Sequence, residues 1–327
     1  MEFPRRKFLH LAAGAAALPT MSRVVGAQTY PTRMITVIVP FAAGGATDVT
    51  ARIIADQMSR ILGQQLRIEN VVGAGGTTGT TRTMRATPDG YTIMMGQLGT
   101  HALSVALYPD LPYRPDVDFA PIGRAVDQPF LIVSRKDFPP GNLGEFVSYV
   151  KTHSSRLNTG HAGVGSITYG TALMLNSVLG VKPVMVPFNG SGPALNALIA
   201  GQTDYMCSPI PDVVQQVLGE LIKAYAIGSL ERSPALPNVP TSLEAGLPDF
   251  QAVGWFGFFA PKDVPRPIVD KLSDALDGAL DDMNVRRRLL ELGCDIPGRA
   301  QRGSQPLADL VKSEIARWTP IIKGARG

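Results

Sequence analysis

The chain has 327 residues, of which 45% are hydrophobic and 18% are charged, with 31 basic and 27 acidic side chains. A chain of this length usually folds around more than one core, so we expect two domains. The charges nearly balance, and no cluster of Lys and Arg is interleaved with aromatic residues, which excludes nucleic acid as a partner. With two cysteines and no histidines at metal-ligand spacing, there is no case for a metal ion or haem, and we expect no cofactor.

The chain begins with a segment, residues 1–27, that has the features of an export signal. Basic residues occupy positions 5–7, a short apolar stretch follows, and Val25-Gly26-Ala27 resembles a signal-peptidase cleavage site. The paired arginines are typical of the twin-arginine pathway, and the apolar stretch is too short to cross a bilayer. Because the signal carries four basic residues and one acidic residue, the mature chain keeps 27 basic and 26 acidic side chains. We expect it to start near Gln28 and to be soluble in the periplasm.

Strand-like and helix-like segments then alternate along the chain. The expected strands are Ile35–Pro40, Leu66–Asn70, Tyr91–Gly96, Phe130–Ser134, Asn158–Ala162, Val184–Phe188, Asp204–Ser208 and Lys223–Gly228. The expected helices are Thr47–Leu62, Leu143–Thr152, Thr168–Leu179, Pro193–Ala200 and Val213–Leu221, with a helical tail over Pro265–Leu290 and Leu307–Ile322. Because the strands are almost continuously apolar, the pattern predicts an α/β fold of parallel sheets covered on both faces. Two Pro- and Gly-rich stretches, Leu111–Pro121 and Ser233–Phe250, are expected to cross between the packed units.

The first strand-to-helix junction carries two glycines, Gly44 and Gly45. Free N–H groups at a helix start favour an anion, and ligands of α/β sheets bind at the carboxyl ends of the strands. No Lys-Ser or Lys-Thr pair follows, so the junction is not a nucleotide P-loop. A second junction, Asn158–Thr168, repeats the pattern, and neither junction contains Lys or Arg. An anion there would be bound by neutral amides and hydroxyls, although glycines also serve tight turns alone.

Several motifs resemble the solute receptors of tripartite tricarboxylate transporters, also called the Bug family. They occur in order from about Tyr30 to the C-terminus, and they are Pro40–Asp48, Gly73–Gly76, Pro88–Thr92, His101-Ala102, Ala106–Tyr108, Leu111–Tyr113 with Asp118–Pro121, Arg232–Thr241, Glu244–Pro248 and Trp255–Gly257.

This resemblance implies a two-lobed, type II-like periplasmic binding protein fold, in which each lobe is a sheet flanked by helices. Lobe one would take residues 28–126 and 252–327, and lobe two residues 127–251. The ligand would be a small carboxylate in the cleft between the first and second glycine loops, delivered to a complex of one large and one small integral membrane subunit. Such a protein binds without chemistry, so we expect a receptor and not an enzyme, and a monomer.

The resemblance also implies which residues form the ligand site. They are Phe41, Ala43, Gly44, Gly45 and Asp48 around the first loop, Thr100 and His101 after the third strand, Gly163, Gly165, Ser166 and Ile167 in the second loop, and Phe188 and Ser208 after later strands. Structural interpretations stay open beside these roles. Asp48 can cap or complement a helix start, Ser166 can cap the following helix, and His101 can pack within its loop.

The sequence departs from the family pattern at three places. Residues 97–99 (Gln-Leu-Gly) replace small hydroxyl residues, Phe188 replaces a common tyrosine, and Ser208 stands where an acidic residue is common. A buried ammonium group requires a charged partner. An amino acid is therefore disfavoured as the ligand, and a simple di- or tricarboxylate or an aromatic carboxylate is favoured.

Two alternative functions stay open. One is a receptor that hands its ligand to a sensor partner. The other is an exported hydrolase using Ser166 or Ser191 with His161, which lacks an evident third residue to orient the histidine. Cys207 and Cys294 lie in apolar, strand-like contexts, so we expect free buried thiols and no disulfide bond.

Overall fold

In the computed structural model, which describes residues 30–326, eight strands form one path in the order β2-β1-β3-β9-β4-β7-β5-β6, and a ninth strand, β8, is paired to β4. The predicted signal, residues 1–27, lies outside the described part. The strands are β1 (Ile35–Val39), β2 (Leu66–Asn70), β3 (Thr92–Gln97), β4 (Phe119–Arg135), β5 (Asn158–His161), β6 (Val184–Pro187), β7 (Tyr205–Pro209), β8 (Ile222–Ile227) and β9 (Val253–Pro261).

Ten α-helices are formed by the described residues. They are α1 (Ala46–Leu62), α2 (Thr77–Met84), α3 (Ser104–Leu107), α4 (Leu143–His153), α5 (Ile167–Leu179), α6 (Ser191–Ile199), α7 (Ile210–Leu218), α8 (Arg266–Asp281), α9 (Met283–Glu291) and α10 (Ser304–Arg326). Short 3-10 turns cover Ala74–Gly76, Ser154–Arg156 and Arg299–Gln301, and a π-type turn covers Gly99–Leu103. Within residues 30–326, no helix combines the length and hydrophobicity that crossing a membrane requires.

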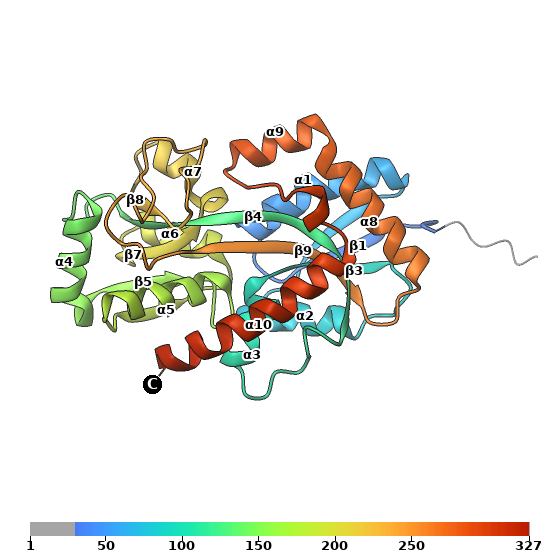
Figure 1. Cartoon of the computed structure of the whole chain (residues 1–327), viewed down its shortest axis with the longest axis horizontal. Helices are drawn as coiled ribbons and strands as arrows, with labels where there is room; N and C mark the ends of the chain where they lie inside the picture. Colours follow the sequence, from blue (N-terminus) through green and yellow to red (C-terminus); the bar gives the residue numbers. More distant parts are fainter. Residues whose placement is uncertain (1–29, 327) are drawn as a thin grey trace, which may run out of the picture.

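The two lobes are joined by the strands β4 and β9, which run through the middle of the molecule (Figure 1). β4 pairs with β9 from Phe119 to Pro129, and from Phe130 onward it pairs with β7 and β8. The stretches 111–121 and 233–250 were expected to cross between the lobes, but β4 and β9 make the connection. The first stretch stays in lobe one, where the Tyr113 hydroxyl donates to the Thr100 carbonyl at 2.9 Å. The second of them stays beside β8, where the Ser242 amide donates to the Ile227 carbonyl at 2.7 Å. The boundaries of lobes one and two stay a prediction.

Both sheets are mixed, so the expectation of purely parallel sheets is wrong at their centres. β1 is parallel to β2 and β3, and β5 is parallel to β6 and β7. β9, however, is antiparallel to β3 and β4, and β4 is antiparallel to β7 and β8. β9 and the first half of β4 were not expected as strands, because they contain Gly and Pro residues that weaken the strand pattern.

The sheet of lobe one is buried on both faces. Val37 and Val39 of β1 pack in a cluster with α1 and α8, whereas Ile38 between them belongs to the cluster on the opposite face. Successive strand residues point to opposite faces, so an almost continuous apolar run is needed to fill both. The helical tail is broken at Asp282, whose side chain accepts hydrogen bonds from the amides of Asn284 and Val285 and so caps α9.

α10 packs on both lobes (Figure 1). It contacts β4, α3 and the π-type turn in lobe one, and α5 in lobe two. Trp318 of α10 is only 2% exposed, and its Nε1 donates to the Glu314 carboxylate at 3.0 Å. Nearby, a Cβ atom on Gly170 of α5 would lie 2.2 Å from the Leu103 side chain of lobe one. The lobes are therefore joined by a close apolar contact under α10.

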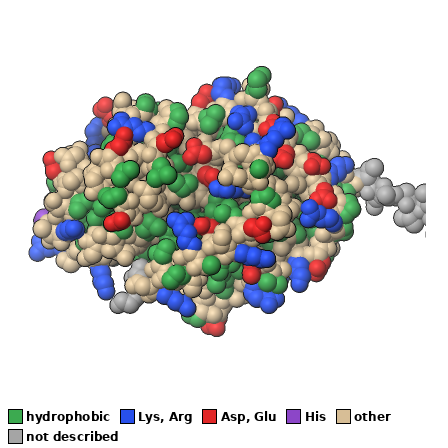
Figure 2. Space-filling view, in the orientation of Figure 1, with side chains coloured by type: hydrophobic (Ala, Val, Ile, Leu, Met, Phe, Trp, Pro, Cys, Tyr) green, Lys and Arg blue, Asp and Glu red, His purple; other side chains and the backbone are tan. Residues whose placement is uncertain are grey.

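The two cysteines and the surface charges match the expectations from the sequence. Cys207 and Cys294 are both buried and free, which confirms the expectation of no disulfide bond. Burial raises the pKa of both thiols, so they stay protonated at neutral pH. Acidic and basic side chains are interspersed over the face of the molecule shown in Figure 2, without a large patch of one sign.

We predict that Trp318→Ala lowers the free energy of unfolding by about 3–5 kcal/mol, because it leaves a cavity in the cluster under α10. Urea unfolding of the protein measures this loss. Met283→Ala serves as the control, since Met283 is 83% exposed and its removal should change stability by less than about 0.5 kcal/mol. Equal stability of the two variants would show that α10 does not fasten the lobes.

Candidate functional site

A cavity of about 330 Å³ lies between the lobes, at the carboxyl ends of β1, β5 and β6. Lobe one lines it with Pro40-Phe41, the turn Gly73–Gly76 and Tyr108, and lobe two with Ala162–Val164 and Pro187–Asn189. None of these residues carries a charged side chain. The position agrees with the general location of ligand sites in α/β sheets, and the walls are mainly backbone and aromatic rings.

Two glycine turns approach each other at the edge of this cavity. A Cβ atom on Gly75 would fall 1.5 Å from the Val164 carbonyl oxygen, and one on Gly163 would fall 3.1 Å from the Gly75 Cα. Gly163 also has a φ of +98°, which disfavours a side chain. The Tyr108 hydroxyl hydrogen-bonds to the Ala74 carbonyl of lobe one at 2.9 Å and to the Val164 carbonyl of lobe two. The main chains of the lobes are therefore in direct contact.

The first glycine loop meets a different part of lobe two than expected. The Ala42 amide donates to the Asn189 carbonyl at 3.0 Å, and a Cβ atom on Gly45 would lie 2.7 Å from the Ser191 hydroxyl. The Ala46 amide, at the start of α1, donates to the Asp212 carboxylate. The second glycine loop thus faces the turn Gly73–Gly76, and the first loop faces the residues around Asn189. Ala43 and Gly44 are exposed and do not line the cavity.

Asp48 supports the first loop from behind. Its carboxylate accepts hydrogen bonds from Arg52 at 2.9 Å through both oxygens, from the Gly44 amide at 3.0 Å and from the Asn70 side chain at 2.9 Å. Burial by itself would raise the pKa of Asp48, but these hydrogen bonds and the Arg52 charge outweigh it, so the pKa lies below its ordinary value. Asp48 is therefore ionised at neutral pH and holds the loop through the Gly44 amide.

Thr100 and His101 lie in the core of lobe one. His101 is fully buried and stacks on Phe259 with ring centroids 3.8 Å apart. The Thr100 hydroxyl donates to the Gln97 carbonyl at 3.1 Å and lies 2.9 Å from His101 Nδ1. Burial lowers the pKa of His101 to about 3, so the ring is neutral. This geometry agrees with the packing interpretation, because neither residue lines the cavity.

Ser166 caps the helix that follows the second loop. It accepts from the Tyr169 amide at 3.2 Å and donates to the Gly163 carbonyl at 2.6 Å. Gly165 lies against the Tyr108 ring, where a Cβ atom would come within 2.6 Å, and Ile167 is buried with its amide beside Gly99. Of the predicted second-loop residues, only Gly163 lines the cavity, and the others shape the loop.

The serine hydrolase alternative has no geometric support. His161 Nδ1 accepts from the Gly163 amide at 3.1 Å, and burial lowers the pKa of this ring to about 4. Within residues 30–326, neither Ser166 nor Ser191 is hydrogen-bonded to His161. In the same range, no three side chains of His, Cys, Asp or Glu gather as they would around a metal ion.

Phe188 lines the cavity, whereas Ser208 does not. The Ser208 hydroxyl instead donates to Asp212 at 3.1 Å. Three contributors were missed as site residues from the sequence: the turn Gly73–Gly76, Tyr108 and Asp212. The first two lie in motifs that resemble the family, which was the available signal. Asp212 lies in the first turn of α7, where an acidic residue is ordinary, and only the tertiary fold brings it to lobe one.

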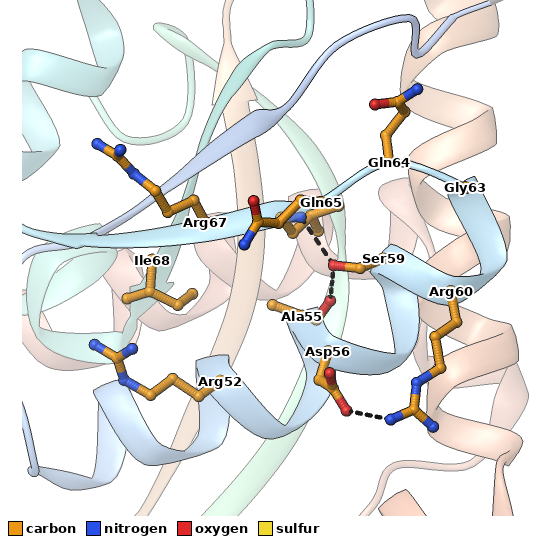
Figure 3. Close-up of a pocket in the computed structure, with 11 residues that line it drawn as sticks. Arg52, Ala55, Asp56, Ser59, Arg60, Gly63, Gln64, Gln65, Arg67 and Ile68 are labelled. Carbon is orange, nitrogen blue, oxygen red and sulfur yellow. Dashed lines mark hydrogen bonds and ion pairs between the residues drawn. The ribbon is translucent and has the colours of Figure 1, made fainter.

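A larger hollow of about 520 Å³ lies on the outside of lobe one, between α1 and β2 (Figure 3). Arg52, Arg60 and Arg67 surround it, but Arg60 is paired with Asp56 at 2.9 Å and Arg52 with Asp48. It is open to solvent and belongs to one lobe. The cavity between the lobes is the better ligand site, because groups from both lobes converge there.

Comparison with known proteins identifies the family. Residues 50–326 match the family model described as the tripartite tricarboxylate transporter family receptor. The chain belongs to this receptor family. A UPF0065 protein from the TAR-I ttuE-ttuC' intergenic region of Agrobacterium vitis is 37% identical, over 98% of this chain and 95% of that protein. The resemblance seen in the motifs is confirmed, and so is the prediction of a receptor and not an enzyme.

Solved structures confirm the two-lobed periplasmic binding protein fold. MatC of Rhodopseudomonas palustris with bound malate is 50% identical, with a TM-score of 0.87, over 90% of this chain and 100% of that chain. An R. palustris protein with adipate is 30% identical, with a TM-score of 0.86, over 90% of this chain and 98% of that chain. A TctC solute binding protein from Polaromonas with no ligand is 26% identical, with a TM-score of 0.63, over 90% of this chain and 100% of that chain. The structure of BugD reaches the same TM-score of 0.87 at 39% identity, over 90% of this chain and 98% of that chain.

We predict that Asp48→Ala lowers the free energy of unfolding at pH 7 by about 1.5–3 kcal/mol, the usual contribution of hydrogen bonds to a charged group. Because the folded-state pKa is lowered, the carboxylate stabilises the fold above the ordinary carboxyl pKa of about 3.9. That contribution is lost as the pH falls through the folded-state pKa. Denaturant unfolding of both proteins from pH 7 to pH 3 should show a constant gap down to about pH 4 and a narrowing gap below it, because the folded-state pKa lies below the ordinary value. A gap that stays constant with pH would contradict an ionised, loop-supporting Asp48.

Proposed function

We propose that this receptor binds a small carboxylate between its lobes and delivers it to the large and small membrane subunits of a tripartite tricarboxylate transporter. Membership of the receptor family supports the delivery role. The relatives solved with malate and with adipate, both dicarboxylates, support the ligand class. The cavity of about 330 Å³ lies within the range of roughly 300–1,000 Å³ that is usual for small-molecule sites.

The proposed contacts are mainly backbone amides. We assign direct contact with the ligand to Phe41, Gly163 and Phe188, which line the cavity, together with the turn Gly73–Gly76 and Tyr108. The other predicted residues shape the loops around the site. A hydrogen bond to a charged group contributes about 1.5–3 kcal/mol. Three or four such bonds reach the ~8 kcal/mol of a micromolar complex without a cationic side chain.

Ligand binding would favour the closed arrangement of the lobes. A ligand that touches both lobes stabilises the state in which both sets of contacts are made. The direct main-chain contact between Gly75 of lobe one and Val164 of lobe two supports the interpretation that this structure is the closed arrangement. We further propose export by the twin-arginine pathway to the periplasm and a monomeric receptor, since one chain holds both walls of the cavity.

We predict that at least one di-, tri- or aromatic carboxylate binds, and that α-amino acids bind at least about 100-fold more weakly. Malate and aspartate form a matched pair, because the hydroxyl group of malate is replaced by an ammonium group in aspartate. Adipate and 2-aminoadipate form a second pair, which differs by one added ammonium group. The cavity offers no acidic side chain to an ammonium group, whose burial then costs several kcal/mol. Isothermal titration of the receptor measures both members of each pair.

Two results would contradict this proposal at different levels. Tight binding of aspartate with no binding of malate would overturn the ligand class but keep the receptor function. Absence of heat from every carboxylate in the panel, with the receptor folded by circular dichroism, would overturn carboxylate binding itself.

We predict that Gly163→Val abolishes carboxylate binding, since its side chain would press on Gly75 and its φ of +98° is strained for a β-branched residue. Gly180→Val is the matched control. Gly180 also has a positive φ, +67°, but a Cβ atom there would meet nothing within 4 Å. The control should lose stability and keep its affinity. If both variants bind equally well in a titration, Gly163 does not belong to the site.

A further inference from the structure

Asp212 joins the two lobes from the side of lobe two. It lies in the first turn of α7 and is only 8% exposed. Its Oδ1 accepts the Ala46 amide at the start of α1, which belongs to lobe one. Its Oδ2 accepts the Ser208 hydroxyl at 3.1 Å, and the Ser191 hydroxyl also hydrogen-bonds to the carboxylate. A carboxylate of the chain itself therefore occupies the anion position at the N-terminus of α1.

Helix ends, and not cations, surround this carboxylate. α1 begins at Ala46, α6 at Ser191 and α7 at Ile210, so the positive ends of three helices converge on it. Within residues 30–326, no Lys, Arg or His forms an ion pair or hydrogen bond with Asp212. An ionised Asp212 in the closed arrangement is thus removed from water without a cationic partner, and only the helix ends and the hydrogen bonds from Ser191, Ala46 and Ser208 offset that loss of hydration.

The charged groups on the neighbouring elements do not pair with Asp212. On β4, Asp127 is paired with Arg124, and burial raises the pKa of Asp127. On β8, Lys223 donates to the carbonyls of Phe138 and Pro140. On α1, Asp48 is paired with Arg52. The segment after α9 lies close to α7, since a Cβ atom on Gly293 would lie 2.4 Å from the Ile210 side chain. This segment carries Asp295, and burial and the charge of Glu231 raise the pKa of Asp295. α6 and β7 contribute only the hydroxyls of Ser191 and Ser208.

We propose that Asp212 is a positioning residue that couples closure of the lobes to proton uptake. Opening the lobes separates Asp212 from Ala46 and returns the carboxylate to water, whereas closing buries it against lobe one. The inference builds on the proposed receptor function, because it concerns the same closure, but its first test requires no ligand.

The sign of the coupling follows from burial. In the closed arrangement burial raises the pKa of Asp212 from 3.8 to about 6, against the hydrogen bonds from Ser191, Ala46 and Ser208. Hydrated in the open arrangement, the carboxyl returns toward its ordinary value. Closing therefore takes up a proton, and the closing equilibrium shifts toward the closed state as the pH falls from 8 to 5, on the order of tenfold. The buried histidines His101 and His161 stay neutral over this range, with pKa values of about 3 and 4.

Small-angle X-ray scattering of the ligand-free receptor from pH 8 to pH 5 measures closure as a fall in the radius of gyration. The parent protein should become more compact on acidification. The asparagine side chain of Asp212→Asn keeps an oxygen that can accept a hydrogen bond from the Ala46 amide, but this side chain cannot ionise. The radius of gyration of this variant should therefore be small and independent of pH. Asp212→Ala removes the acceptor and should be more open than Asp212→Asn at every pH. Asp249→Asn, an exposed aspartate of lobe two, is the matched control and should behave as the parent.

Isothermal titration with malate at each pH gives a second readout. The affinity of the parent should rise on acidification relative to that of Asp212→Asn, and the comparison removes the titration of malate itself. The inference is overturned if parent and Asp212→Asn show the same pH dependence of scattering, or no dependence in either. Failure of malate to bind would count against the proposed ligand class and would leave the scattering result standing. Circular dichroism verifies that each variant is folded.

Discussion

The closed arrangement of the lobes depends on a contact between two stretches of backbone. At Gly75 in lobe one, even a Cβ atom would fall 1.5 Å from the Val164 carbonyl oxygen of lobe two. Any side chain at this position would hold the lobes apart. Because main chain meets main chain, the walls beside the contact present amide and carbonyl groups, and the rings of Phe41 and Phe188 supply apolar surface. The composition of the cavity thus follows from the closeness of the lobes.

A cavity without charged side chains has a consequence for how an anion is held. A lysine or arginine in the wall would have to leave water with the ligand, and it would remain as an unpaired buried charge once the ligand departed. The positive charge of Arg52 on α1 is instead bound to Asp48, which holds the Gly44 amide. Its charge therefore supports the first loop without entering the cavity. Oriented amides bind an anion and are less costly to leave unoccupied, which suits a protein that must release its ligand.

The sequence predicted the elements whose signals are local. β1 and α1 follow from an apolar run, a glycine junction and an amphipathic stretch, all within residues 35–62. β9 and the first half of β4 were missed because their strand character depends on partners far away in the chain. The helix break at Asp282 was missed for the opposite reason, since the apolar periodicity continues across a local cap.

The candidate site divides in the same way. Gly163 and Phe188, which line the cavity, could be selected from the sequence because family motifs and strand ends mark them. Which loop of lobe one faces which loop of lobe two could not be predicted, because this depends on how the two lobes pack on each other. His101 illustrates the limit: its position after β3 suggested ligand contact, yet stacking on Phe259 places it in the core. Asp212 lies 166 residues from its Ala46 partner, and nothing local distinguishes it from other first-turn acids.

The contact surface between the lobes has two different ends, and this difference determines how they can separate. Under α10 the contact is apolar, with Leu103 against Gly170, and exposing it costs about 25 cal/mol for each Å² of apolar surface. Around Asp212 the contact is polar, and the carboxylate, the Ala46 amide and two hydroxyls exchange their partners for water on opening. Separation is therefore less costly at the Asp212 end, because water replaces the partners of its polar groups. Asp212, the residue that we propose to couple closure to proton uptake, lies at this polar end. A change in its charge state therefore acts directly on a contact between the lobes.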